Sequence, residues 1–79
     1  MSIEEIFQTM RELAAEQFAM EPAEITMETS FEEDLGADSV EVIDLLMSLE
    51  DEFQVEIPDE AIDEIRTVGE LTAYIEEHS

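Results

Sequence analysis

The amino-acid sequence predicts an all-α fold, a small four-helix bundle with three main helices, one short helix and a long loop between the first and second helices. Apolar residues recur at spacings of three and four along most of its 79 positions. Capping boxes, in which Ser, Asp or Thr precedes Glu by three residues, open three of these periodic segments. Strand-like alternation is confined to residues 54–58, too short to build a sheet. We expect a single domain over residues 1–79.

The first helix is predicted over residues 3–18. Ser2 and Glu5 form its capping box, and Pro22 blocks its continuation. Residues 21–36 mix polar residues with apolar anchors, which indicates a long ordered loop with room for one short helical turn. The helix has a continuous apolar stripe: Ile3, Ile6, Phe7, Met10, Leu13, Ala14 and Phe18.

The second and third helices follow two further start signals. Gly36 supplies a flexible or positive-φ position, and Asp38 with Glu41 forms a capping box for a helix over residues 39–53. Pro58 ends the extended stretch that follows, and Asp59 is expected to cap a short helix reaching about residue 65.

The last helix is predicted to open at the capping box of Thr67 and Glu70 and to run to the C-terminus. Gly69 near its start should weaken it only modestly. Tyr74 and the four phenylalanines are assigned to the core. His78 is expected in a disordered tail, where no catalytic geometry could be held.

Charge is the most unusual property of the composition. Arg11 and Arg66 face 24 acidic residues, for a formal net charge of −22. Such a polyanion repels nucleic acids and anionic membranes, and it attracts proteins with Lys/Arg patches. No apolar run is long enough to span a bilayer, so membrane insertion is not expected. The same repulsion disfavours self-association, and we expect a monomer.

This charge leads to a prediction about stability. Like charges oppose the compact state, so salt, Mg²⁺ or Ca²⁺ should raise the melting temperature. Thermal melts followed by circular dichroism test this, and a melting temperature unchanged by Mg²⁺ or Ca²⁺ would count against it.

The sequence has no signal for export and none for a dedicated metal site. The chain has no cysteine, and its N-terminus lacks the basic and apolar segments of a signal peptide, so we expect a cytoplasmic protein without disulfides. The acidic stretch around Asp34 does not match a calcium-binding loop, and two glycines do not make a phosphate-binding loop. No dedicated metal site or catalytic set of residues is expected.

Ser39 is the one candidate for chemistry. Asp38 already supplies the helix cap, so the hydroxyl of Ser39 is not needed for that role. A phosphate attached there would lie beside unpaired backbone N–H groups and the positive end of the helix dipole. On these grounds alone, an ordinary first-turn serine is the favoured interpretation.

The helix that begins at Ser39 carries two apolar stripes. Val42, Leu45, Leu46, Leu49 and Phe53 form a core stripe. The second stripe leaves two interpretations open: a helix placed centrally in the bundle, or an exposed patch for a partner. It consists of Val40, Ile43 and Met47.

The segment DLGADSVEVIDLLMSLEDEF at residues 34–53, with VEIPDE at 55–60 and TVGEL at 67–71, resembles the acyl carrier protein family. The resemblance covers nearly the whole chain and implies the four-helix fold already predicted. It implies that a phosphopantetheinyl transferase attaches 4'-phosphopantetheine from coenzyme A to Ser39. The arm would carry acyl groups as thioesters to the enzymes of fatty acid biosynthesis, and the chain itself would catalyse nothing.

The resemblance also implies a docking surface for basic patches on those enzymes, made of Asp38, Val40, Glu41, Asp44, Met47, Glu50 and Asp51. It further implies shelter for short acyl chains between helices, for which Leu49, Ile62 and Ile65 are available. Val40 stands where many members have Leu, which bears on which enzymes fit best. Two alternatives remain open: a polyketide or peptidyl carrier, and an unmodified acidic helical adaptor.

Overall fold

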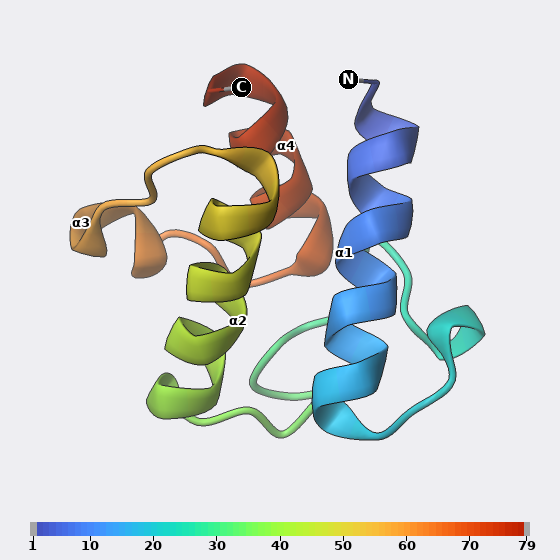
Figure 1. Cartoon of the computed structure of the whole chain (residues 1–79). Coiled ribbons are helices and arrows are strands. Elements are labelled where there is room, and N and C mark those ends of the chain that lie inside the picture. Colours follow the sequence, from blue (N-terminus) through green and yellow to red (C-terminus); the bar gives the residue numbers. More distant parts are fainter. Residues whose placement is uncertain (1, 79) are drawn as a thin grey trace.

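The computed structural model describes residues 2–78, and that part of the chain forms four α-helices and one 3-10 turn (Figure 1). An isolated antiparallel bridge between Ser30 and Thr67 is its only β-type pairing within that range. The predicted all-α four-helix bundle with its long first loop is confirmed. The elements are α1 Ile3–Phe18, η1 Pro22–Glu24, α2 Ser39–Phe53, α3 Asp59–Ile62 and α4 Val68–His78.

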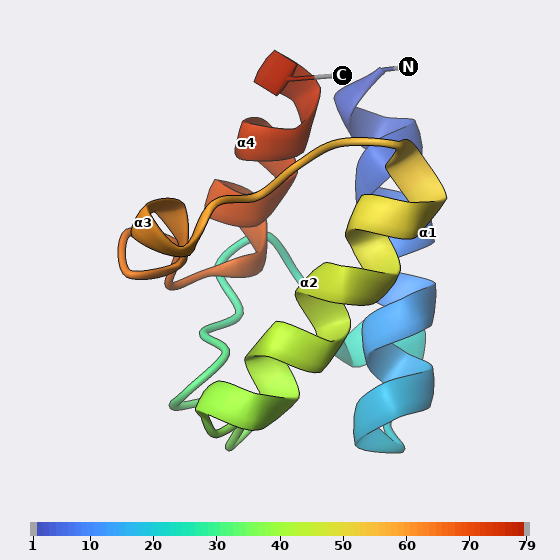
Figure 2. The ribbon, with the colours of Figure 1, turned by 60° about the vertical axis from the view of Figure 1, so that its left-hand side comes forward.

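α1 is the helix that joins the bundle together, because it packs against both α2 and α4. Figures 1 and 2 show that α2 and α4 run opposite to α1, while the short α3 stands to one side. Both ends of the chain lie at the same end of the bundle, away from the start of α2. None of the helices in residues 2–78 is long and apolar enough to cross a bilayer.

The core is built from the apolar stripes of the three long helices. Phe31 and Phe53 are buried, and Phe7, Phe18 and Tyr74 pack against the core, as predicted. Burying each large side chain contributes about 1.5 to 3 kcal/mol, which a domain this small needs. The largest fully buried apolar residues are Ile6, Met10, Ile25, Leu45, Leu46, Leu49, Val68, Leu71 and Ile75.

The capping boxes explain why the helix starts were predictable. Ser2 Oγ accepts from the Glu5 amide at 3.3 Å, and Thr67 Oγ1 accepts from the Glu70 amide at 3.2 Å. A carboxylate oxygen of Glu70 in turn accepts from the Thr67 amide at 3.1 Å. Each side-chain bond pairs a first-turn amide that has no partner within its helix.

The prediction for the third helix was wrong in two respects. The N-cap is Pro58, so Asp59 lies inside the helix, and the helix ends at Ile62 and not near residue 65. The chain tightens after Ile62: the Glu64 amide donates to Ala61 O at 3.0 Å, and the Ile65 amide is shared between two carbonyl oxygens. Ile65, which follows this turn, is buried in the core.

The long loop after α1 is pinned to the start of α4. The Val68 amide donates to Thr29 O at 2.9 Å, and the Gly69 amide donates to Met27 O at 2.8 Å. These loop carbonyls therefore pair first-turn amides of α4 that would otherwise face water. Gly69 permits the contact, since a Cβ built there would lie 2.8 Å from Met27 O.

We expect Gly69→Ala to lower the free energy of unfolding by about 1 to 3 kcal/mol, because the new methyl group pushes the loop away from α4. Helix propensity alone predicts a gain of about 1 kcal/mol from the same change. Urea denaturation shows which of the two effects is larger. A variant more stable than the wild type would contradict the close contact between Gly69 and Met27 O.

His78 does not lie in a disordered tail, contrary to the sequence-based expectation. It is the last residue of α4, and its ring stacks on Tyr74 with centroids 4.1 Å apart. Its Nδ1 lies 2.9 Å from Tyr74 O. The stacking surface of Tyr74, four residues earlier on the same helix face, provides the order.

Candidate functional site

Ser39 is the first residue of α2, and its side chain is exposed. Asp38 Oδ1 accepts from the Glu41 amide at 2.9 Å, and Glu41 Oε1 accepts from the Asp38 amide at 3.2 Å. The predicted capping box is therefore confirmed, and it is worth about 1 kcal/mol to the helix. The Ser39 hydroxyl has no hydrogen-bond partner among residues 2–78, so it is free to react.

The loop before Ser39 is held in place by its own hydrogen bonds. Ser30 N donates to the carboxylate of Asp34 at 2.7 Å, and Ala37 N donates to Phe31 O at 2.8 Å. Gly36 adopts a φ of 63°, and a Cβ there would meet nothing within 4 Å. The backbone conformation thus favours glycine here, whereas space does not demand it, and the positive φ agrees with the sequence-based expectation.

Two amides at the start of α2 are left for a ligand. Asp38 pairs the Glu41 amide through its side chain and the Val42 amide through its carbonyl. The amides of Ser39 and Val40 have no partner among the described residues. Together with the positive end of the helix dipole, they favour an anion attached at Ser39.

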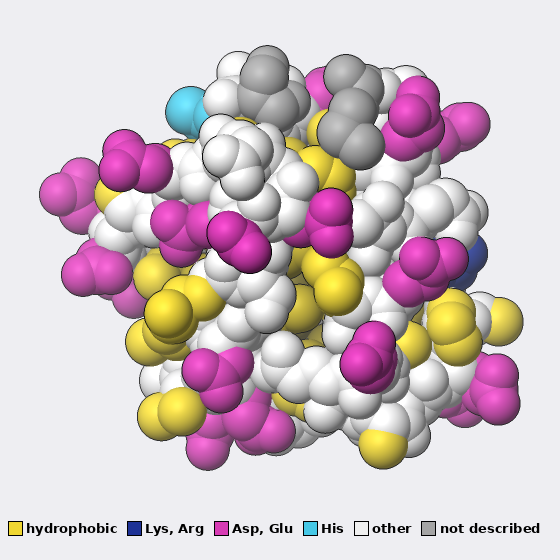
Figure 3. Space-filling model, in the orientation of Figure 1, with side chains coloured by type: hydrophobic (Ala, Val, Ile, Leu, Met, Phe, Trp, Pro, Cys, Tyr) yellow, Lys and Arg dark blue, Asp and Glu magenta, His cyan; other side chains and the backbone are white. Residues whose placement is uncertain are grey.

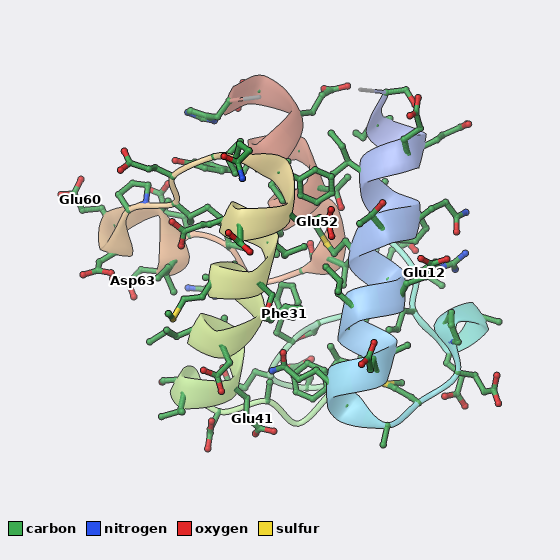
Figure 4. All side chains as sticks on the ribbon, viewed as in Figure 1. Glu12, Phe31, Glu41, Glu52, Glu60 and Asp63 are labelled. Carbon is green, nitrogen blue, oxygen red and sulfur yellow. The ribbon has the colours of Figure 1, made fainter. Side chains whose placement is uncertain are left out.

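A surface hollow of about 1100 Å³ opens beside Ser39, between the preceding loop, α2 and the segment 59–66. Its walls combine apolar and charged side chains. Phe31 points into the space behind α2, whereas Glu60 and Asp63 project outward from α3 (Figure 4). A hollow of this size is large enough to hold a small organic ligand. Its apolar lining residues are Phe31, Ala37, Val42, Ile43, Ile62 and Ile65.

Arg66 is the cation that lines this hollow, and sequence reasoning did not single it out. Its amide donates to the Glu70 carboxylate at 3.1 Å, and its carbonyl accepts from the Phe31 amide at 3.1 Å, so its backbone is fixed. Its guanidinium forms no ion pair with any described carboxylate. The scarcity of cations in the sequence is the signal that could have drawn attention to it. The other charged residues that line the hollow are the acids Glu32, Glu33, Asp38, Asp59 and Asp63.

Arg11, the other cation, is occupied elsewhere. Its Nη2 donates to Ile25 O at 2.6 Å, and its guanidinium carbon lies 4.6 Å from the ring centre of Phe7. Arg11 therefore fastens the first loop to α1 and takes no part in the site.

The second apolar stripe of α2 lies at the surface, and its role as a patch for a partner stays a prediction. Val40, Ile43 and Met47 are 67%, 43% and 61% exposed, and they are the large apolar residues that the described chain leaves at its surface. Figure 3 shows apolar atoms beside acidic ones on this side of the molecule. We call Val40, Ile43 and Met47 the apolar patch.

The acids predicted for docking surround this patch unequally. Asp38, Asp44 and Asp51 are exposed, and Glu50 is half-buried. Glu41 is also half-buried, and its carboxylate accepts a hydrogen bond from the Asp38 amide. Gln17 of α1 donates to Glu41 O at 2.7 Å and ties this end of α2 to the bundle.

Residues 2–78 contain no cluster of three or more His, Asp or Glu side chains able to hold a metal ion. His78 is the last residue of α4, and that end of α4 lies opposite to the start of α2 (Figures 1 and 2). The site thus offers a nucleophilic hydroxyl, an anion position and a hollow.

Comparison with known proteins agrees with this geometry. A family model described as a phosphopantetheine attachment site matches residues 8–75. The acyl carrier protein of Clostridium acetobutylicum is 40% identical over 74 residues, covering 94% of this chain and 96% of that protein. The acyl carrier protein of Clostridium perfringens strain SM101 is 43% identical, covering 94% and 97%. The structure of the acyl carrier protein from Enterococcus faecalis superposes with a TM-score of 0.85 at 37% identity, with both chains fully covered. The chain belongs to the acyl carrier protein family.

Proposed function

We propose that this chain carries acyl intermediates of fatty acid synthesis as thioesters, on a 4'-phosphopantetheine arm joined to Ser39. The observation that carries the proposal is the free hydroxyl of Ser39 at the start of α2, next to two unpaired amides and the hollow. We further propose that the protein is a cytoplasmic monomer and that it catalyses no reaction itself.

The residues around Ser39 suit a covalently attached phosphate. Ser39 Oγ would act as the nucleophile toward the donor and then hold the phosphodiester. The amides of Ser39 and Val40 would face its negative charge, and Arg66 would offset part of the repulsion from Asp38 and its neighbours. When bound, the arm supplies a thiol that forms thioesters; the protein supplies the anchor and the hollow.

The hollow also suits the temporary shelter of a short acyl chain. Its apolar walls come from α2, from the loop residue Phe31 and from the segment after α3. Ile62 and Ile65 belong to this lining, whereas Leu49 is fully buried in the core and does not line the hollow. Moving an alkyl chain from water onto these walls is favourable in proportion to its length.

Thioester chemistry gives a direct test of carrier function. The chain is loaded from an acyl-coenzyme A by a phosphopantetheinyl transferase, and its intact mass is measured before and after neutral hydroxylamine. We expect loss of the acyl group alone, with the arm retained. An unmodified adaptor would take up no acyl mass at all.

We propose that enzymes dock on the apolar patch and its acidic rim. The patch gives a small desolvated contact, and Asp38, Asp44, Glu50 and Asp51 would steer Lys/Arg patches toward it. Rim charges mainly raise association rates, which suits a carrier that visits many enzymes briefly.

We expect Met47→Asp to lower the transferase kcat/KM for the chain by about tenfold, because docking must then desolvate a new charge at the patch. Ala73→Asp places the same charge on an exposed position of α4 and should leave loading unchanged. Equal loading of both variants would contradict the docking surface.

A further inference from the structure

We propose that Met47 is a site of reversible oxidation, and that its conversion to methionine sulfoxide by hydrogen peroxide turns down docking on α2. The effect on docking rests on the docking surface proposed above, whereas the selectivity of the oxidation does not. Among residues 2–78, Met47 is the one sulfur-bearing residue that is strongly exposed.

The described methionines differ sharply in how far their side chains are exposed to solvent. Met47 is 61% exposed, whereas Met10 is fully buried and the hydroxyl of Thr72 lies against its sulfur at 3.4 Å. Met20 and Met27 are half-buried, and Met20 packs against the core. Among these four methionines, the sulfur of Met47 is therefore the one that peroxide reaches most easily.

In the chain without the arm, no other kind of side chain is oxidised by peroxide as readily as methionine. The sequence has no cysteine, so thioethers are its most readily oxidised groups. Hydrogen peroxide is neutral, and the charge of −22 does not repel it. The thioether sulfur of Met47 takes one peroxide oxygen as the O–O bond breaks, and water leaves; sulfur is oxidised by two electrons. A dithiol-using methionine sulfoxide reductase reverses the change, forming a disulfide and water.

The position of Met47 gives this oxidation a consequence. Its side chain belongs to the apolar patch and also lines a second hollow of about 420 Å³ at the far end of α2, with Glu50, Asp51 and Val55. A sulfoxide oxygen there carries partial negative charge among carboxylates and must be desolvated when a partner docks. The flexible apolar contact that methionine offers is lost at the same time.

The test uses the unloaded chain, because the thiol of a loaded arm would also react. The chain is treated with hydrogen peroxide, and oxidation at each methionine is followed by peptide mass mapping. We expect Met47 to oxidise at least about tenfold faster than Met10, Met20 or Met27, in keeping with its access. Transferase kcat/KM is then measured for the oxidised chain, and it should fall by about tenfold and recover after reductase treatment.

Met47→Leu is the matched control. It keeps an apolar side chain of similar volume but has no sulfur, so the loading of this variant should be the same before and after peroxide treatment. Faster oxidation of Met20 or Met27 would overturn the inference. So would unchanged loading of the chain oxidised at Met47 while Met47→Asp still loads slowly, and that pattern leaves the docking surface standing. Normal loading of Met47→Asp as well would instead overturn the docking surface.

Discussion

Ser39→Ala is expected to abolish attachment of 4'-phosphopantetheine and every acyl transfer that depends on it. The substitution removes the only atom proposed to bond the phosphate, so the loss should be complete rather than partial. The fold should survive, because Asp38 and Glu41 cap α2 and the Ser39 hydroxyl bonds to nothing in the described chain. Intact mass after incubation with coenzyme A and a transferase measures the loading, and circular dichroism measures the fold.

Ser48→Ala is the control for this experiment. Ser48 is also exposed on α2, but its hydroxyl donates to Asp44 O at 3.3 Å within the helix. This variant should load normally. Loading of Ser39→Ala at the wild-type level would exclude Ser39 as the attachment point.

Leu46→Ala is expected to cost about 2 to 5 kcal/mol of the free energy of unfolding. Leu46 is 1% exposed in the core stripe of α2, so the change leaves a cavity as well as losing buried apolar surface. A domain of this length has only about 4 to 12 kcal/mol in total, so the variant should be close to unfolding at physiological temperature. Urea denaturation followed by circular dichroism gives the difference.

Val40→Ala is the control for Leu46→Ala, because it truncates an apolar side chain on the same helix at an exposed position. Val40 is 67% exposed, so its truncation should change the free energy of unfolding by less than about 0.5 kcal/mol. If Leu46→Ala cost no more than Val40→Ala, the two stripes of α2 would have been assigned to the wrong faces.

Local signals made the main helices predictable. Ser2, Asp38 and Thr67 each cap a helix through a bond to a residue three positions on, and such bonds can be recognised in sequence without knowledge of the fold. The starts and ends predicted for α1 and α2 agree with the structure residue for residue. The prediction for the third helix failed because Asp59 is a good N-cap residue by type, yet Pro58 takes that position. Only the hydrogen bonds after Ile62 reveal where the chain turns.

What the sequence could not provide depends on contacts between distant residues. Gly69 reads as a weak point of a helix, yet it admits the carbonyl of Met27 from a loop some forty residues earlier in the chain. Arg66 lines the hollow beside Ser39, and its carbonyl accepts a hydrogen bond from the amide of Phe31, which lies in the long loop between α1 and α2. The exposure of Val40 and Met47 was likewise undecided until the helices were placed, since periodicity identifies stripes but not which of them is covered.

The central claim is that Ser39 bears the arm, and localised mass measurement tests it most directly. The wild-type chain is incubated with coenzyme A, Mg²⁺ and a phosphopantetheinyl transferase that is active on a control carrier, and its intact and fragment masses are then determined. We predict one phosphopantetheine per chain, on the fragment that contains Ser39. No increment, or an increment on any other residue, would contradict the account.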